Sequence, residues 1–173
     1  MSLIITPQNA FPCIFDLQTV KQYLKIDDNN DDNIINIIID YAINYAQKIT
    51  NTLISQDIYD ISVYDIQNNQ VKLNLKPISN INTIESDGVQ LANGTGYIIQ
   101  NNCIIFNNPT TECCINLLGG YTSLALLSPE LKMAILMHIS AAYDNRSGTS
   151  QAVPFAVNNI YNKISKLRIS FNN

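Results

Sequence analysis

Residues 32–50 read Asp-Asn-Ile-Ile-Asn-Ile-Ile-Ile-Asp-Tyr-Ala-Ile-Asn-Tyr-Ala-Gln-Lys-Ile-Thr, and this stretch decides the fold class of the chain. At 100° per residue, its polar side chains gather on one stripe, and its apolar side chains fill roughly half of the circumference. The pattern predicts one long helix. Because a surface helix needs an apolar arc of only about 100°, we expect this helix to be central to the core or to meet another subunit.

A shorter helix is expected just before it, over residues 17–24, with Asp16 as its N-cap. The link between the two helices, residues 27–32, reads Asp-Asp-Asn-Asn-Asp-Asp, and similar residues build calcium-binding EF-hand loops. Counted from Asp27 or Asp28, however, the link lacks the Gly at position six and the Glu at position twelve of those loops. We therefore expect Asp31 or Asp32 to cap the long helix instead, where a negative charge suits the helix dipole.

Short runs of β-branched and aromatic residues follow, separated by turn signals such as Asp87-Gly88 and Asn93-Gly94. They predict an antiparallel β region over about residues 57–118. The expected strands are residues 58–62, 71–75, 81–86, 97–100, 104–106 and 113–117.

Ser128-Pro129-Glu130 is a strong helix start, because Ser caps, Pro suits the first helical position and Glu suits the first turn. This helix should reach Tyr143 or Asn145, and a last helix is expected over about residues 156–167. The order of elements predicts an α+β fold: a small helical bundle, made of the long central helix and the Pro129 helix, with an inserted antiparallel β region. We expect residues 1–173 to form a single domain, with helices in about 17–50 and 128–168.

The Pro129 helix has one apolar face that we expect in the core, carrying Leu131, Ile135, Leu136, Ile139, Ala142 and Tyr143. Met133 and Met137 project to a different side, near Ala134 and Ala141. Met-rich surface is adaptable, and the interior of one small domain does not require a second apolar face. The predicted subunit-interface residues are Ile37 and Tyr41 of the long central helix and Met133 and Met137 of the Pro129 helix.

Composition excludes several classes of function. The 173 residues are 46% hydrophobic and 14% charged, with a net charge of −4, so the chain is globular and has no basic field for phosphates. No apolar run reaches the roughly 18–20 residues that span a bilayer, and the first residues lack the basic start of a secretion signal. The four cysteines show neither CxxC nor Cys/His zinc spacing. We expect no membrane partner, no cofactor and no tight DNA binding.

The sequence offers few groups for catalysis. His138 is the only histidine and lies within a predicted helix, where a lone histidine is more often a packed side chain than a base or a ligand. Gly94-Thr95-Gly96 and Gly119-Gly120 do not complete a phosphate-binding motif, so turns explain them. The sequence predicts no catalytic, cofactor-binding or metal-ligating residue, and hence no enzyme. The rival hypothesis is a small ligand-binding or enzymatic α+β domain whose site folding assembles from scattered residues.

Three segments resemble the head-tail connector (adaptor) proteins of tailed bacteriophages and their prophage relatives. The first runs from Leu17 through the acidic link to Thr50, the second is Leu75-Lys76-Pro77-Ile78-Ser79-Asn80-Ile81, and the third is Leu118-Gly119-Gly120-Tyr121 with residues 128–136 and 143–146. The chain departs from the family in having no Trp near the start of the strand region. Its last helix matches only loosely, through Ile164 and Arg168.

The resemblance implies a structural subunit, one of a ring of about a dozen copies that docks beneath the phage portal and lets DNA pass without specific binding. It implies assembly in the host cytoplasm and then a place in the neck of the virion, beside portal and other neck or tail proteins. Another neck or tail-completion protein is the related alternative.

Overall fold

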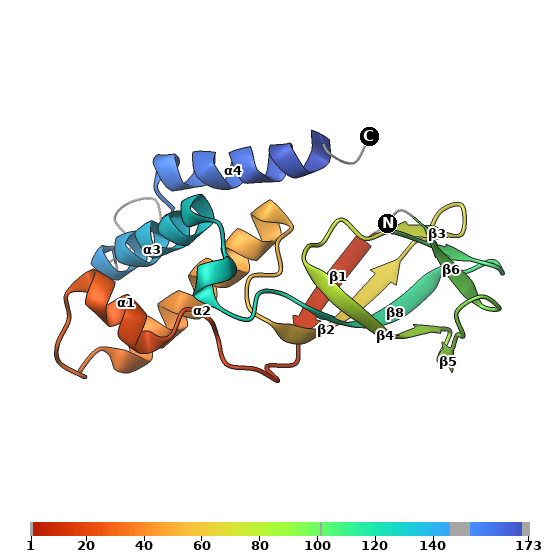
Figure 1. Cartoon of the computed structure of the whole chain (residues 1–173), viewed down its shortest axis with the longest axis horizontal. Coiled ribbons are helices and arrows are strands. Elements are labelled where there is room, and N and C mark those ends of the chain that lie inside the picture. Colours follow the sequence, from red (N-terminus) through yellow and green to blue (C-terminus); the bar gives the residue numbers. More distant parts are fainter. Residues whose placement is uncertain (1, 101, 146–152, 171–173) are drawn as a thin grey trace. The chain divides into compact units, whose positions relative to one another are not determined.

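The computed structural model describes residues 2–100, 102–145 and 153–170, with the backbone alone at 166–170 (Figure 1). The chain forms two compact units, each made from two segments of sequence. We call them the β unit, which is the described part of Met1–Pro12 with Ser55–Gly120, and the helical unit, which is Cys13–Ile54 with the described part of Tyr121–Asn173. The α+β fold is thereby confirmed.

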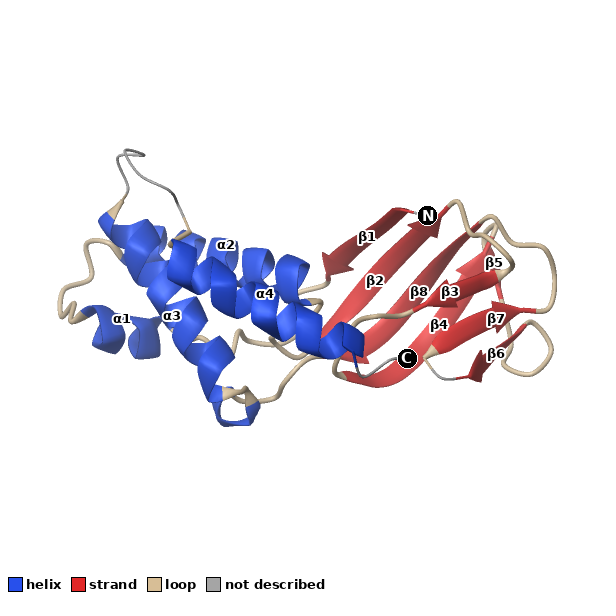
Figure 2. Cartoon of the chain, turned by 90° about the horizontal axis from the view of Figure 1, so that it is seen from above, coloured by secondary structure: helices blue, strands red, loops and turns tan. Residues whose placement is uncertain are grey.

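The helical unit contains four α-helices and one turn of 3₁₀ helix in its described residues (Figure 2). They are α1 (Leu17–Leu24), α2 (Asp32–Thr50), η1 (Leu124–Leu126), α3 (Pro129–Asp144) and α4 (Phe155–Ser170). The bounds predicted for the first two α-helices are confirmed, and those of the last two differ by up to three residues. No helix among the described residues is both long and apolar enough to cross a membrane.

The predicted helix starts are present. Asp16 accepts a hydrogen bond from the backbone N–H of Thr19 at 2.8 Å, and the bonds from Thr19 lower the pKa of the Asp16 carboxyl. Ser128 accepts one from the N–H of Leu131 at 3.3 Å, and Pro129 is the first residue of α3. Each cap satisfies a helical N–H that has no intrahelical partner.

The acidic link between α1 and α2 is held by a lysine. The Lys21 side chain is only 4% exposed, and its ammonium donates to Asn29 and to Asp32, both at 2.7 Å. Asp31 is the N-cap residue of α2 but makes no side-chain capping bond; its carboxylate accepts from the hydroxyl of Tyr143. The prediction of a cap in this link is therefore right in position and wrong in its chemistry, since Asp31 bonds to Tyr143 and Asp32 to a lysine of the neighbouring helix.

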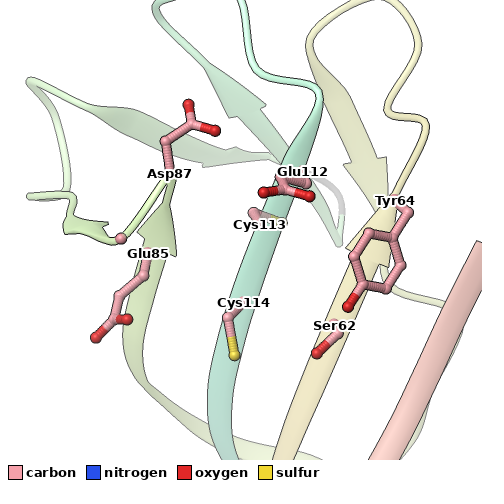
Figure 3. Close-up of a pocket in the computed structure, with 8 residues that line it drawn as sticks. Ser62, Tyr64, Glu85, Asp87, Glu112, Cys113 and Cys114 are labelled. Carbon is pink, nitrogen blue, oxygen red and sulfur yellow. The ribbon is translucent and has the colours of Figure 1, made fainter.

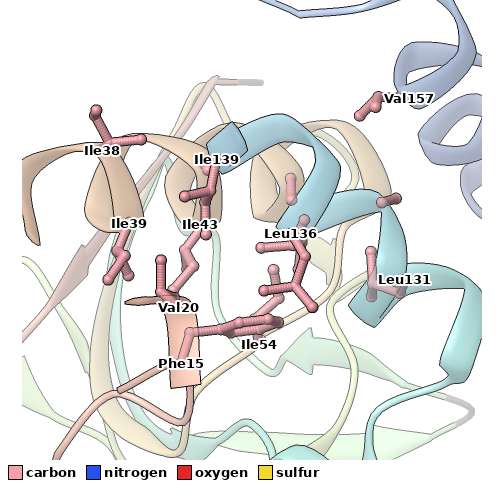
Figure 4. Close-up of a cluster of buried hydrophobic side chains, with 14 of the residues drawn as sticks. Phe15, Val20, Ile38, Ile39, Ile43, Ile54, Leu131, Leu136, Ile139 and Val157 are labelled. Atoms are coloured by element: carbon pink, nitrogen blue, oxygen red, sulfur yellow. The ribbon is translucent and has the colours of Figure 1, made fainter. Parts of the chain in front are cut away.

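The core of the helical unit joins all four α-helices (Figure 4). Phe15, just before α1, lies among side chains of α1, α2 and α3 and is 1% exposed. Of the six core positions predicted on α3, four are buried and two are partly buried. The buried four are Leu131, Ile135, Leu136 and Ile139; the others are Ala142 and Tyr143.

The β unit contains a five-stranded sheet and a three-stranded sheet. The larger has the order β1 (Ser2–Pro7), β2 (Asp57–Tyr64), β8 (Glu112–Gly119), β4 (Ile78–Ser86) and β5 (Val89–Gln90), with antiparallel neighbours. The smaller has the order β3 (Gln70–Lys72), β7 (Cys103–Phe106) and β6 (Tyr97–Gln100). Along β2 and β8 every second residue is buried, so the five-stranded sheet has one buried face and one open face.

Differences from the predicted strands follow from long-range pairing. The six predicted strands exist, although β3 ends at Lys72 where Leu75 was expected. Strand β1 was not predicted, and it pairs with β2 from Ser2 opposite Tyr64 to Pro7 opposite Tyr59. Cys113 and Cys114 are neighbours on β8 and point to opposite faces of the sheet, since Cys113 is buried and Cys114 is only partly buried.

The carboxylate of Asp57, at the start of β2, is buried. It is 5% exposed, and its oxygens accept from the backbone N–H groups of Asn9 and Ala10, each at 2.8 Å, and from that of Ile58. Asp57 therefore ties the segment after β1 to the start of β2.

Candidate subunit-contact surfaces

The exposed side of α2 carries two of the predicted contact residues. Ile37 is 63% exposed and Tyr41 is 43% exposed, and residues four apart lie next to each other on one helix face. The other exposed residues of α2 are polar, namely Asn33, Asn36, Asp40, Asn44 and Lys48. Ile37 and Tyr41 thus form an apolar island on a polar stripe, although one edge of Tyr41 also contacts the ring of His138.

The two methionines of α3 differ. Met133 is 50% exposed, whereas Met137 is partly buried and packs against the helical core. Ala134, which was expected beside them on a separate face, is fully buried. The α3 surface available to a partner is therefore narrower than the sequence suggested. Of the two methionines, only Met133 is exposed.

His138 lies inside an aromatic cluster formed with Tyr41, Tyr45 and Tyr161. Its ring meets those of Tyr41 and Tyr45 edge-on at 5.3 Å between centroids and that of Tyr161 at 6.1 Å. The Tyr161 hydroxyl is 3.4 Å from Nδ1, and Nε2 is buried without a hydrogen-bond partner among the described residues. Burial lowers the pKa of His138 to about 4. The imidazole is therefore neutral at physiological pH and packs as an aromatic ring.

The open face of the five-stranded sheet has a shallow depression of about 210 Å³ beside Cys114 (Figure 3). Its lining is Ser62, Tyr64, Glu85, Asp87, Gly88, Glu112, Cys113 and Cys114. Burial, and then the charges of Asp60 and Glu85, raise the pKa of the Cys114 thiol. A reactive cysteine needs the opposite effect, because the thiolate is the nucleophile. No group of three potential metal ligands occurs in the described parts of the chain.

A ladder of side-chain hydrogen bonds crosses the same open face. Asp60 accepts from Gln8 at 2.8 Å and from Asn116 at 2.6 Å. Asn116 accepts from Asn82 at 2.8 Å, and Asn82 accepts from Asn80 at 2.9 Å. The ladder links the end of β1 with β2, β8 and β4. Sequence reasoning missed it, because its members come from four separate segments.

Charge is divided unevenly between the units. Residues 1–12 and 55–120 contain six acidic and two basic residues, so the β unit accounts for the whole net charge of −4. None of the five strands of the larger sheet contains a Lys or an Arg. Pairing in the sheet puts Asp60, Glu85 and Glu112 on the same side as Cys114, so the open face is acidic and its strands supply no cation to neutralise a phosphate.

Several exposed apolar side chains were not predicted as contacts. In the β unit they include Ile4 at 55% and Val89 at 62% exposed, and in the helical unit Leu126 at 61% and Phe155 at 76%. Single exposed apolar residues are common on protein surfaces. Strand β1 is different, because Leu3, Ile4 and Ile5 are all more than a third exposed and stand in a row.

Comparison with known proteins gives a family and a fold. Residues 15–88 match the family described as "Phage gp6-like head-tail connector protein", and this range contains the first two segments on which the resemblance was recognised. Arg146, in the third segment, lies outside the described residues. No curated protein matches the chain.

Solved structures with a similar fold come from gene transfer agent particles. A chain in the neck of an empty particle, computed with C6 symmetry, has a TM-score of 0.69 at 14% identity, with 93% of this chain and 94% of that chain covered. A chain in the neck of a native particle, computed with C12 symmetry, has 0.69 at 13% identity, with the same shares. A chain in the virion of a native particle has 0.68 at 14% identity, covering 92% and 94%.

The likeness extends over both units, whereas the family match covers α1, α2 and the first strands after them. At these identities the solved structures establish the fold, and the family match supplies the relationship. The resemblance predicted from the sequence is confirmed over residues 15–88, which match the phage gp6-like head-tail connector family.

Proposed function

We propose that this chain is a structural subunit of the neck of a tailed phage or a phage-like particle, and that it acts as one copy in a ring beneath the portal. The match of residues 15–88 to the head-tail connector family carries this proposal. The fold agrees with it over 93% of the chain, since one similar chain belongs to a neck computed with C12 symmetry. A closed ring of about a dozen copies is the corresponding assembly here.

Neighbouring copies meet in part through the helical unit. Ile37, Tyr41 and Met133 are apolar and at least 43% exposed, although the unit has a complete core of its own. Burying such side chains between subunits removes their apolar surface from water, which favours association by about 25 cal/mol per Å². Met137 contributes less, because it already packs against the core.

The acidic β unit suits the passage of DNA. A surface that gripped phosphates would slow a sliding duplex, and affinity for DNA rises with the number of Lys and Arg that neutralise phosphates. The five-stranded sheet has none in its strands. Portal and neck proteins are the expected partners, with assembly in the host cytoplasm before incorporation into the virion.

The experiment is to measure the mass of the purified chain alone and after mixing with the portal protein of the same phage, and then to image the complex. We expect rings on the portal. A chain that binds neither the portal nor other copies of itself contradicts the proposal, and a ring that joins only a tail component assigns the chain to tail completion instead.

Charged variants test the predicted contacts. Ile37→Asp and Met133→Asp should each lower the fraction of ring-bound chain about tenfold or more, because a buried unpaired carboxylate costs well over the equivalent of one decade in affinity. Asn36→Asp is the matched control, since it adds the same charge at the neighbouring exposed polar position of α2. The far-ultraviolet circular dichroism of all three should equal that of the wild type. Unchanged assembly of Ile37→Asp and Met133→Asp would remove these residues from the interface.

A further inference from the structure

Strand β1 leaves one edge of the five-stranded sheet open. It is the first strand in the sheet order, pairs with β2 on one side, and has no strand on its other side among the described residues. Its six residues, Ser-Leu-Ile-Ile-Thr-Pro, contain no charge, and their register with β2 has no bulge. An exposed, regular, apolar edge of this kind is a template for another strand.

The backbone groups on the open edge can be assigned. The N–H of Gln8 donates to the carbonyl of Ile58 at 2.9 Å, and opposite residues in an antiparallel pair alternate between bonded and non-bonded pairs. Continuing the register, Ser2, Ile4 and Thr6 direct their N–H and C=O groups to β2. Those of Leu3 and Ile5 point outward. Pro7 falls at an outward position too, where its missing N–H costs the β1–β2 ladder nothing.

The opposite edge of the same sheet, formed by β4 and β5, is protected against pairing with another strand. The pairing of β4 with β8 is interrupted twice, between Ile78 and Asn80 and between Ile81 and Thr83, and β5 covers only Glu85 and Ser86. Bulges, short edge strands and nearby charges are the usual ways to prevent edge-to-edge pairing. Apart from Pro7 at its end, strand β1 has none of them, and it pairs with β2 along its whole length.

The smaller sheet has an open edge of its own at β6. The outward N–H of Tyr97 donates to the carbonyl of Ala92, and its carbonyl accepts from the N–H of Gly94. Ile99 is the next residue of β6 whose backbone N–H and C=O point outward. Ile99 is 42% exposed, and the four residues of β6 carry no charge. Strands β1 and β6 lie at opposite sides of the β unit in both views (Figures 1 and 2).

We propose that the open edge of β1 receives β6 of a neighbouring copy, so that a short inter-subunit sheet forms at each junction of the ring. This inference rests on the proposed function. Two different edges on opposite sides of one unit make a head-to-tail contact, which is the kind that generates rings. In a ring of identical copies, every β1 edge also has one neighbouring copy that can supply a β6 strand.

The first test compares edge variants for ring formation on the portal. Leu3→Pro removes an outward N–H and leaves the bonds to β2 intact, as Pro7 does; Ile5→Lys and Ile99→Lys put a charge at each side of the junction. Each should lower the ring-bound fraction about tenfold or more. The matched control is Val89→Lys, which should assemble like the wild type. Val89 is an exposed apolar residue of β5, at the protected edge of the sheet.

The second test uses the wild-type protein and needs no variant to fold. Backbone amides of Leu3 and Ile5 should exchange with deuterium readily in the free chain and at least about tenfold more slowly in the ring. Those of Ile4 and Thr6, which are bonded to β2, should be protected in both and serve as the internal control.

The outcomes separate this inference from the proposed function. If the wild type forms no ring, the proposed function fails and this inference with it. If rings form but the Leu3 and Ile5 amides exchange as fast as in the free chain, the edge inference alone is overturned. Rings from Ile99→Lys, with none from Leu3→Pro, overturn β6 as the partner of β1.

Discussion

The helical unit and the β unit differ in charge balance and in the partners that their polar side chains bond to. In the helical unit, acidic and basic residues are equal in number, and the buried Lys21 forms an ion pair with Asp32 of the acidic link. In the β unit, acidic residues exceed basic ones by four, and the polar groups of the open face bond to one another. Exposed apolar groups differ as well, since the helical unit exposes side chains on helices, whereas the β unit exposes a row of three on the edge strand β1.

This difference indicates two kinds of contact surface. A helix satisfies its own backbone, so α2 can offer a partner only side chains such as Ile37 and Tyr41. An edge strand offers backbone N–H and C=O groups as well, which bind a partner strand with little regard to sequence. We therefore expect the helical unit to supply specificity and the β unit to supply a general strand-pairing site.

The largest effect should come from a core substitution in the helical unit. Ile35→Ala removes a side chain that is 0% exposed on α2, and we expect it to lower the free energy of unfolding by about 2–5 kcal/mol. Ile37→Ala, two residues away on the exposed stripe, should change it by less than about 0.5 kcal/mol. Urea denaturation followed by circular dichroism measures both. Equal effects would mean that Ile37 is buried in the free protein and is not a contact residue.

A backbone substitution tests the β unit next. Gly120 has a φ of +94°, and a Cβ there would lie 1.9 Å from the carbonyl oxygen of Ser55. Gly120→Ala should therefore cost about 3 kcal/mol or more. Gly88→Ala also has a positive φ, but its Cβ would meet open space, so it should cost only about 1 kcal/mol. Thermal or urea unfolding measures the difference, and similar costs would show that the 55–56 segment moves aside without strain.

The smallest effect is a pH dependence specific to the helical unit. The pKa of His138 is near 6.5 in the unfolded chain and lowered to about 4 in the folded one, so the unfolded state binds more protons between these values. Stability should then fall as the pH drops from 6.5 to 4, by roughly 2–3 kcal/mol. Burial raises the pKa of Tyr161, which contacts the ring, so this tyrosine adds no titration in this range.

His138→Phe supplies the control, because it keeps an aromatic ring and removes the titration. Subtracting its unfolding free energy from that of the wild type at each pH cancels the carboxylates that the two proteins share. A difference that is constant from pH 7 to pH 4 would contradict the buried, neutral histidine.

The parts of the fold that depend on local pattern were predictable. Helix α2 was predicted over residues 32–50 and α1 over 17–24, because periodicity and caps are encoded within each segment. Strand β1 was missed for a physical reason. It is exposed on both faces and so lacks alternation, and its partners, such as Asp60 for Thr6, lie more than fifty residues away.

The candidate contact residues were predictable only in part. Exposure of Ile37, Tyr41 and Met133 follows from their positions on single helices. Met137 is covered, and the cluster around His138 draws Tyr161 from a helix that begins more than ten residues after α3 ends. The ladder on the open face of the sheet needs four segments at once. Such features depend on how segments meet, which no local pattern records.

The split of the β unit across the sequence has a consequence for biosynthesis. Residues 2–7 leave the ribosome before the strand that binds them, because residues 57–64 emerge only after the segment that contains α1 and α2. At a translation rate of about 5–20 residues per second, the nascent Leu-Ile-Ile stretch has no partner strand for roughly 3–10 s. During that interval, this uncharged stretch is exposed to pairing with other nascent or unfolded chains, which makes co-translational aggregation the hazard of this strand order.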